Sequence, residues 1–173
     1  MDDALDAFSI RLPVRIRTGV EADLPALEAF GQLVAHDVPV GRVHAQQCEG
    51  QALILVAEVN GEPAGQLWVD LDRRRAERAG EIWAVFVLPC LRAQGIGARL
   101  VRAAEQALQA RGFRWALLGV EADNPGARRL YERLGYTLTA STPAPEAREP
   151  TPASGVAGQW VFRKELRDLE RTG

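Results

Sequence analysis

The chain has few of the residues that mark several large classes of protein. It holds only two cysteines, Cys48 and Cys90, too few for the disulfide framework of a small secreted domain. No apolar run reaches the roughly 20 residues that a membrane-spanning helix needs, and we recognise no signal peptide. We therefore expect a cytoplasmic protein that does not bind a membrane.

Positive charge comes almost entirely from arginine, and Lys164 is the single lysine. The formal net charge of −2 leaves no basic surface for nucleic acid. We expect neither a nucleic-acid partner nor a bound metal. A length of 173 residues with 47% hydrophobic residues predicts one domain over 1–173. A loose start over 1–9 and a flexible Pro- and Ala-rich loop over 141–158 belong to it.

Hydrophobic periodicity predicts alternating strands and helices along the chain. The hairpin signal Asn60-Gly61 separates two of the strands, and residues 72–80 form a charged loop. The other expected elements are a strand over 10–17, a helix over 21–35, a short helix near 43–50, and strands over 53–59, 64–71, 82–87, 115–120, 136–139 and 160–164.

The most informative stretch joins a buried strand, a glycine turn and an amphipathic helix. Ile82–Val87 is apolar throughout, and Arg-Ala-Gln-Gly-Ile-Gly follows at 92–97. The next segment places Ile96, Leu100 and Leu108 on one helical face. Backbone N–H groups at such a helix N-terminus lack partners and attract phosphate. No Gly-Lys-Ser/Thr follows, and Leu100 replaces the third glycine of a dinucleotide fingerprint, so neither of those nucleotide sites fits.

A second motif follows the predicted strand over 115–120. Asn124 is suited to cap a helix, Pro125 suits its first turn, and Gly135 ends it. The residues Ala127, Leu130, Tyr131 and Leu134 share one face of this helix.

The two motifs together resemble the GCN5-related N-acetyltransferase (GNAT) family. The 92–97 segment is similar to its acyl-CoA site. Residues 124–136 are similar to its pattern Asn-x-x-Ala-x-x-Leu-Tyr-x-x-x-Gly-Phe, with Tyr136 in place of the final Phe. The resemblance implies a mixed α/β fold with a mostly antiparallel twisted sheet and helices on both faces. It also implies that strands 82–88 and 115–121 run parallel and splay apart.

The resemblance further implies which residues hold acetyl-CoA, the acyl donor. The backbone of Val85 and Val87 would pair with the pantetheine arm, and Asn124 would lie near that arm. Arg92 would assist through its N–H or its charge, with a solvated surface arginine as the alternative. The pyrophosphate would be held by the backbone of Gln94, Gly95, Ile96 and Gly97.

Two side chains are candidates for catalysis. Tyr131 matches the family tyrosine that protonates the departing CoA thiolate, and the alternative is a core tyrosine. Glu81 opens its strand and shares its alternation with Val85 and Val87, provided that no bulge intervenes. It is therefore a candidate base for the amine proton. A solvated carboxylate at the strand end is the alternative, with an ordered water or a backbone carbonyl as the base.

The sequence thus predicts an acetyl-CoA-dependent N-acetyltransferase that acts on a primary amine of a small molecule or peptide. The alternative is a non-catalytic, regulatory acyl-CoA-binding module with the same fold, because no unambiguous base is present. The sequence does not identify the acceptor, and it leaves a homodimer open.

Overall fold

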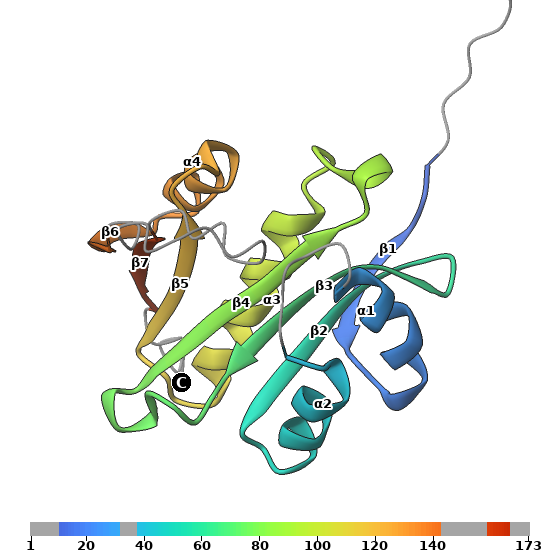
Figure 1. Cartoon of the computed structure of the whole chain (residues 1–173), viewed down its shortest axis with the longest axis horizontal. Helices are drawn as coiled ribbons and strands as arrows, with labels where there is room; N and C mark the ends of the chain where they lie inside the picture. Colours follow the sequence, from blue (N-terminus) through green and yellow to red (C-terminus); the bar gives the residue numbers. More distant parts are fainter. Residues whose placement is uncertain (1–10, 32–37, 143–158, 167–173) are drawn as a thin grey trace, which may run out of the picture.

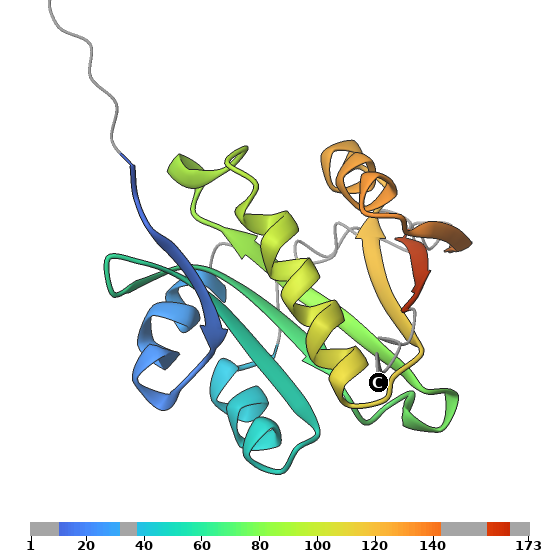
Figure 2. The same cartoon turned by 180° about the vertical axis from the view of Figure 1, so that it is seen from behind.

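The computed structural model describes residues 11–31, 38–142 and 159–166, which form a seven-stranded sheet with helices on both faces (Figures 1 and 2). Its strand order is β1-β2-β3-β4-β5-β7-β6. The strands are β1 (Val14–Thr18), β2 (Ala52–Val59), β3 (Glu62–Asp70), β4 (Ala79–Val87), β5 (Trp115–Glu121), β6 (Thr137–Thr142) and β7 (Gln159–Glu165). The helices are α1 (Leu24–Gly31), α2 (Val40–Cys48), α3 (Ile96–Ala110) and α4 (Pro125–Arg133), with short 3-10 turns η1 (Glu21–Asp23), η2 (Arg75–Glu77) and η3 (Pro89–Leu91).

The strand directions confirm the expected fold class. Every neighbouring pair is antiparallel except β4 and β5, which run parallel. Pairing of these two strands extends only from Ala79 opposite Trp115 to Ile82 opposite Leu118. Beyond that point both described strands continue without pairing to each other, so the parallel pair splays as predicted.

Two apolar layers hold the helices against the sheet. Helix α3 covers one face and α1 and α2 the other (Figures 1 and 2). On α3, Leu100, Ala104 and Leu108 are fully buried, as the helical periodicity predicted. A β-carbon at Gly80 would collide with Leu108, so glycine lets α3 lie directly on β4. This close packing fixes α3, and with it the glycine turn at its N-terminus.

A bulge interrupts β4 beside the splay. Gln66 pairs with Phe86 and Trp68 pairs with Trp83, so β4 carries one extra residue there. Ala84 takes a positive φ of 52° at this point. A bulge reverses the alternation of side chains along a strand. After Ala84, each side chain of β4 therefore points to the face opposite to the one that regular alternation would give.

The bulge makes one sequence expectation wrong. Val85 and Val87 pack in the layer that contains α3, together with Ile82. Glu81 neighbours Ile82 and therefore points to the opposite face. Glu81 does not share a face with Val85 and Val87, because the extra residue lies between them.

Several predicted boundaries move. The helix expected over 21–35 begins as η1, where Asp23 accepts the Val20 N–H at 2.8 Å, and Pro25 lies in the first turn of α1. Strand β1 starts at Val14 rather than at residue 10, and α2 starts at Val40 rather than near residue 43. Strand β4 starts at Ala79 rather than at residue 82, and β6 includes residues 141–142, which were predicted to belong to the loop. The predictions for 1–10, 32–35 and 143–158 lie outside the described residues.

Candidate active site

A cavity of about 910 Å³ opens where β4 and β5 part. Its lining residues place it on the α3 side of the sheet, between the N-terminal end of α3 and helix α4. Its lining includes Val85, Phe86, Val87, Leu91, Arg92, Ala93, Gly95, Ile96, Gly97, Ala98, Arg102, Asn124, Gly126, Ala127, Leu130, Tyr131, Arg133 and Leu134. The structure therefore brings both sequence motifs to one cavity.

The N-terminus of α3 presents unpaired donors to this cavity. Gly95 precedes the helix with a φ of +79°, a left-handed conformation that glycine adopts without strain. The first bond into the helix is from the Arg99 N–H to the Gly95 carbonyl at 3.1 Å. The N–H groups of Ile96, Gly97 and Ala98 consequently have no partner within the helix. Three free donors at the positive end of a helix dipole form a suitable site for phosphate.

Gly97 leaves room at this end of the cavity. A β-carbon built there would lie 3.9 Å from Leu130 and 4.0 Å from Val87, which is ordinary contact. Any larger side chain at this position would extend into the space between α3, α4 and β4. The absence of a side chain keeps that space open for a ligand to reach the backbone.

Beyond Ile82, the edge of β4 that faces β5 carries backbone groups that β5 does not pair. The Leu88 N–H bonds to the Ala64 carbonyl of β3 at 2.9 Å, so the groups of the preceding residue, Val87, point to the cavity side. The Val87 carbonyl accepts a hydrogen bond from Arg92 Nε at 3.0 Å. Arg92 also lies 5.8 Å from the centre of the Phe86 ring. The Arg92 side chain thus connects the loop before α3 to the end of β4 by a hydrogen bond.

Asn124 holds the start of α4. Its Oδ1 accepts the Ala127 N–H at 3.0 Å, which satisfies one of the free donors at that helix end. The side chain lines the cavity as well. The structure therefore places Asn124 both in the predicted helix cap and beside the cavity where the resemblance expects the pantetheine arm.

Tyr131 lines the cavity from α4 and is only 6% exposed. Burial raises its pKa from the ordinary value to about 12. The hydroxyl therefore keeps its proton throughout the neutral range. A protonated phenol in the cavity is what a proton donor to a leaving group requires.

Glu81 and Gln94 do not line the cavity. Glu81 is half-buried at the start of β4 and forms an ion pair with Arg73, with Nη1 and Oε2 3.5 Å apart. Gln94 is exposed in the loop before α3. Of the ten site residues that the sequence suggested, only these two are missing from the cavity lining, and Gln94 lies between the lining residues Ala93 and Gly95.

Comparison with known proteins assigns the family. The family model described as the acetyltransferase (GNAT) family matches residues 24–136, about two thirds of the chain. That span includes the splayed strands, α3 and α4. The chain belongs to the GNAT family.

Individual relatives agree with this assignment. The mycothiol acetyltransferase of Streptomyces coelicolor is 35% identical over 144 residues, which cover 76% of this chain and 46% of that protein. The chain spans less than half the length of the curated mycothiol acetyltransferases that it matches.

Solved structures share the GNAT fold. The ribosomal-protein-S18-alanine N-acetyltransferase of Escherichia coli has a TM-score of 0.72 at 22% identity, covering 93% of this chain and 99% of that one. The Salmonella typhimurium protein yncA, solved with its cofactor acetyl-CoA, has a TM-score of 0.74 at 22% identity. That match covers 91% of this chain and 96% of yncA.

Two cationic residues of the GNAT cavity were missed by the sequence reasoning. Neither Arg102 nor Arg133 was among the site residues that the sequence suggested. The structure places both in the cavity lining. Arg102 lies four residues after Ala98, so it falls on the stripe of α3 that points to the cavity. That spacing was the available signal.

The described residues show two further features of the GNAT domain. Over 11–31, 38–142 and 159–166, His, Cys, Asp and Glu side chains nowhere gather in a group of three or more that could hold a metal ion. Among the helices of this part of the chain, none has the length and apolar character needed to span a membrane.

The buried tyrosines predict a loss of stability in base. Tyr131 and Tyr136 are the only tyrosines, and burial raises the pKa of both. Above the ordinary tyrosine pKa of about 10 the unfolded chain releases these protons while the folded chain retains them. The free energy of unfolding should therefore be fully retained below about pH 10 and fall as the pH rises towards about 12.

Urea unfolding at pH values of about 9, 10 and 11 measures this loss. The double variant Tyr131→Phe, Tyr136→Phe removes both phenols and keeps both rings. Its unfolding free energy should decline less over the same interval. An equal decline in wild type and double variant would show that other groups cause it.

Proposed function

We propose that the chain is an acetyl-CoA-dependent N-acetyltransferase that acetylates a primary amine of a small molecule or peptide. The observation that carries this proposal is the single cavity that combines the free N–H groups of α3, the parted edge of β4 and the protonated Tyr131. The acetyl-CoA complex of the similarly folded yncA supports acetyl-CoA as the donor. Acetyl-CoA supplies an activated acyl group as a thioester.

The cavity residues suggest how the donor is held. The N–H groups of Ile96, Gly97 and Ala98 would bind the pyrophosphate, aided by the charges of Arg102 and Arg133. The backbone of Val85 and Val87 would pair with the pantetheine arm as a further strand does. Arg92 Nε already donates a hydrogen bond to the Val87 carbonyl. The pantetheine arm could therefore pair with that carbonyl only after Arg92 moves.

The transfer needs a donor to the developing oxyanion and a proton for the thiolate. The Val85 N–H lies at the bulge, on the same edge as the groups of Val87, and β5 does not pair there. It would stabilise the oxyanion that forms when the amine attacks the thioester carbonyl. Tyr131 would give its proton to the departing sulfur.

The amine would approach from the sheet face opposite α3, because the donor occupies the α3 side of the splay. Glu81 points to that opposite face. We therefore keep Glu81 as the proposed acceptor of the amine proton, either directly or through a water molecule. The Glu81 side chain is 32% exposed, which leaves its carboxylate reachable although it pairs with Arg73.

Relatives indicate two classes of acceptor. One relative is named for mycothiol and one neighbour for the alanine of a ribosomal protein. A free-thiol release assay with acetyl-CoA and a panel of amino sugars, amino acids and peptides with free N-termini tests both classes. We expect thiol release that depends on the amine. CoA binding without turnover on the whole panel would count against this proposal.

A regulatory acyl-CoA-binding module is the second candidate. Within the described part of the chain, the lining of the cavity includes neither a carboxylate nor an imidazole. Such a module would bind acetyl-CoA with the same residues but would release no thiol with any amine. The assay above therefore separates the two candidates.

Substitution of Glu81 by glutamine tests the proposed base. Glu81→Gln keeps the shape and removes the basic site, so the plot of log kcat/KM against pH should lose the limb that belongs to this carboxylate. Affinity for acetyl-CoA should not change, since Glu81 lies outside the cavity.

Glu77→Gln is the matched control, because Glu77 forms a similar exposed pair with Arg74 at 3.3 Å. It should leave the profile unchanged. An unaltered profile and normal turnover for Glu81→Gln itself would leave a water molecule or a backbone carbonyl as the base.

A further inference from the structure

Tyr136 carries a hydroxyl where the family pattern has phenylalanine. The residue is 3% exposed, and its hydroxyl lies near Glu105 without forming a hydrogen bond of regular geometry. A buried hydroxyl without a partner is unfavourable by comparison with the apolar residue that fits the same space. The extra oxygen of Tyr136 is therefore not explained by packing.

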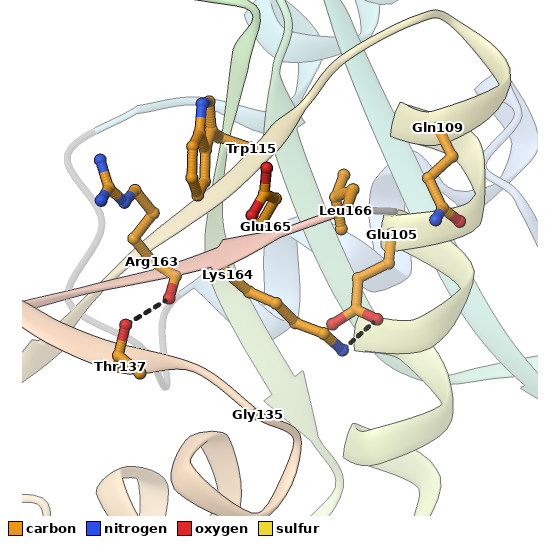
Figure 3. A pocket seen from close by; sticks show the side chains of 9 residues that line it. All are labelled: Glu105, Gln109, Trp115, Gly135, Thr137, Arg163, Lys164, Glu165 and Leu166. Atoms are coloured by element: carbon orange, nitrogen blue, oxygen red, sulfur yellow. Dashed lines mark hydrogen bonds and ion pairs between the residues drawn. The ribbon is translucent and has the colours of Figure 1, made fainter. Parts of the chain in front are cut away.

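A buried carboxylate lies on the neighbouring helix. Glu105 of α3 is 8% exposed, and its Oε2 accepts a hydrogen bond from Lys164 Nζ of β7 at 2.8 Å (Figure 3). Its second oxygen, Oε1, is buried and has no partner. Lys164, the only lysine of the chain, also lies 5.6 Å from the centre of the Tyr136 ring. Glu105, Lys164 and Tyr136 form the Glu105 cluster.

The Tyr136 hydroxyl and Glu105 Oε1 are suited to form a hydrogen bond with each other. Burial raises the pKa of Tyr136, and the negative charge of nearby Glu105 raises it further. The phenol therefore stays protonated and remains a donor. A small rotation of either side chain would let the Tyr136 hydroxyl donate to Glu105 Oε1 and satisfy both atoms.

Lys164 keeps this cluster close to neutral. A second cavity, of about 660 Å³, is lined by Glu105, Lys164 and Gly135 among others (Figure 3). The Lys164 side chain is about a quarter exposed, so water reaches it from this side. An ammonium paired with a carboxylate fixes the carboxylate in one orientation.

Tyr136 is also joined directly to Tyr131. Its N–H donates to the Tyr131 carbonyl at 3.0 Å, in the turn that ends α4. The two rings meet edge to face, with centres 5.9 Å apart and planes 67° apart. Tyr136 therefore contacts Tyr131 on one side and lies beside Glu105 and Lys164 on the other.

This contact links the two walls of the acetyl-CoA cavity. Helix α3 supplies the proposed phosphate site at its N-terminus, and α4 supplies Tyr131. We propose that the Glu105 cluster positions Tyr131: Glu105 and Lys164 fix the Tyr136 hydroxyl, and Tyr136 fixes the Tyr131 ring relative to α3. Tyr136, Glu105 and Lys164 are positioning residues, and this inference rests on the proposed acetyltransferase function.

The first test is a double-mutant cycle between Tyr136 and Tyr131. Tyr136→Phe restores the family residue and keeps the ring, so the variant should fold. We expect kcat to fall about tenfold, because a displaced proton donor loses alignment. The Kd for acetyl-CoA, measured by calorimetry, should stay within about twofold of wild type. In a Tyr131→Phe background, Tyr136→Phe should cause no further loss of kcat.

A merely structural role predicts different results. Tyr136→Phe would then leave kcat unchanged, or would lower it by the same factor in both backgrounds. Either result overturns the proposal. Glu105→Gln, which keeps the shape and removes the charge, should reproduce the kcat loss of Tyr136→Phe, and wild-type kcat in this variant would also overturn it.

A second readout needs no acceptor. Protein labelled with ¹³C at the tyrosine ζ-carbon should give two signals, one for each tyrosine, and the two Tyr→Phe variants assign them. We expect Glu105→Gln to move the Tyr131 signal as well as the Tyr136 signal. A Tyr131 signal that stays in place overturns the positioning role.

The two measurements separate this inference from the proposed function. If Tyr131→Phe turns over at the wild-type rate, or no amine is acetylated, the proposed function of Tyr131 fails and the NMR result alone decides the coupling. If Tyr131→Phe is impaired while Glu105→Gln and Tyr136→Phe are not, the proposed function stands and the positioning role is wrong.

Discussion

Gly97→Glu should bind CoA at least about a hundredfold more weakly than wild type, because the new carboxylate would occupy the proposed pyrophosphate site and repel its charge. The fold should survive, since a β-carbon at this position lies 3.9 Å from its nearest neighbour, Leu130. A glutamate in the first turn of α3 also interacts favourably with the helix dipole. The loss of affinity would therefore not come from unfolding.

Calorimetry with CoA measures this effect, and thermal unfolding checks the fold. Gly97→Ala is the matched control, because it adds only the β-carbon for which the structure has room. We expect the alanine variant to keep most of its affinity and to be at least as stable as wild type. Wild-type affinity in a folded Gly97→Glu variant would show that the phosphates bind elsewhere.

Tyr131→Phe should lower kcat by about 10²-fold or more, within the range of general acid catalysis. The substitution removes one hydroxyl and retains the ring that packs against Tyr136. Acetyl-CoA should bind with nearly unchanged affinity, because the phosphate site at the N-terminus of α3 is untouched. The measurement is single-turnover kinetics, which isolates the chemical step from product release.

The leaving group gives a sharper version of the same test. An acyl donor whose thiol has a lower pKa needs less help from a proton donor. The defect of Tyr131→Phe should therefore shrink with an activated thioester and persist with acetyl-CoA. A variant with wild-type single-turnover rates on both donors would reduce Tyr131 to a packing residue.

Much of the fold follows from local sequence signals. The faces of α3 and α4, the hairpin at Asn60-Gly61 and the splayed pair were all predicted from periodicity, turn residues and the resemblance. Helix ends were less predictable, because the capping contact at the start of η1 comes from Asp23, within the expected helix itself. Tertiary pairing set the strand ends, as where Ala79 pairs with Trp115.

The candidate site shows why the sequence was not sufficient. The alternation argument for Glu81 assumed a regular strand, and the bulge at Ala84 lies in a stretch that contains neither glycine nor proline. On a helical wheel Arg102 falls on the polar face of α3, like a surface residue. Only the position of α4 across the cavity shows that Arg102 lines it. The Glu105 cluster joins residues up to 59 positions apart, a distance at which local patterns carry no information.

The position of β7 has a consequence for how the protein acquires its activity. Among the described strands β7 comes last along the chain, yet it inserts between β5 and β6 and pairs with both. While the chain is still on the ribosome, β5 has an open edge, and Lys164 is not yet present to pair with Glu105. A nascent chain that has exposed both family motifs therefore still lacks the support behind Tyr131. Catalytic competence should appear only after residues 159–165 have left the exit tunnel, in one late step rather than gradually during translation.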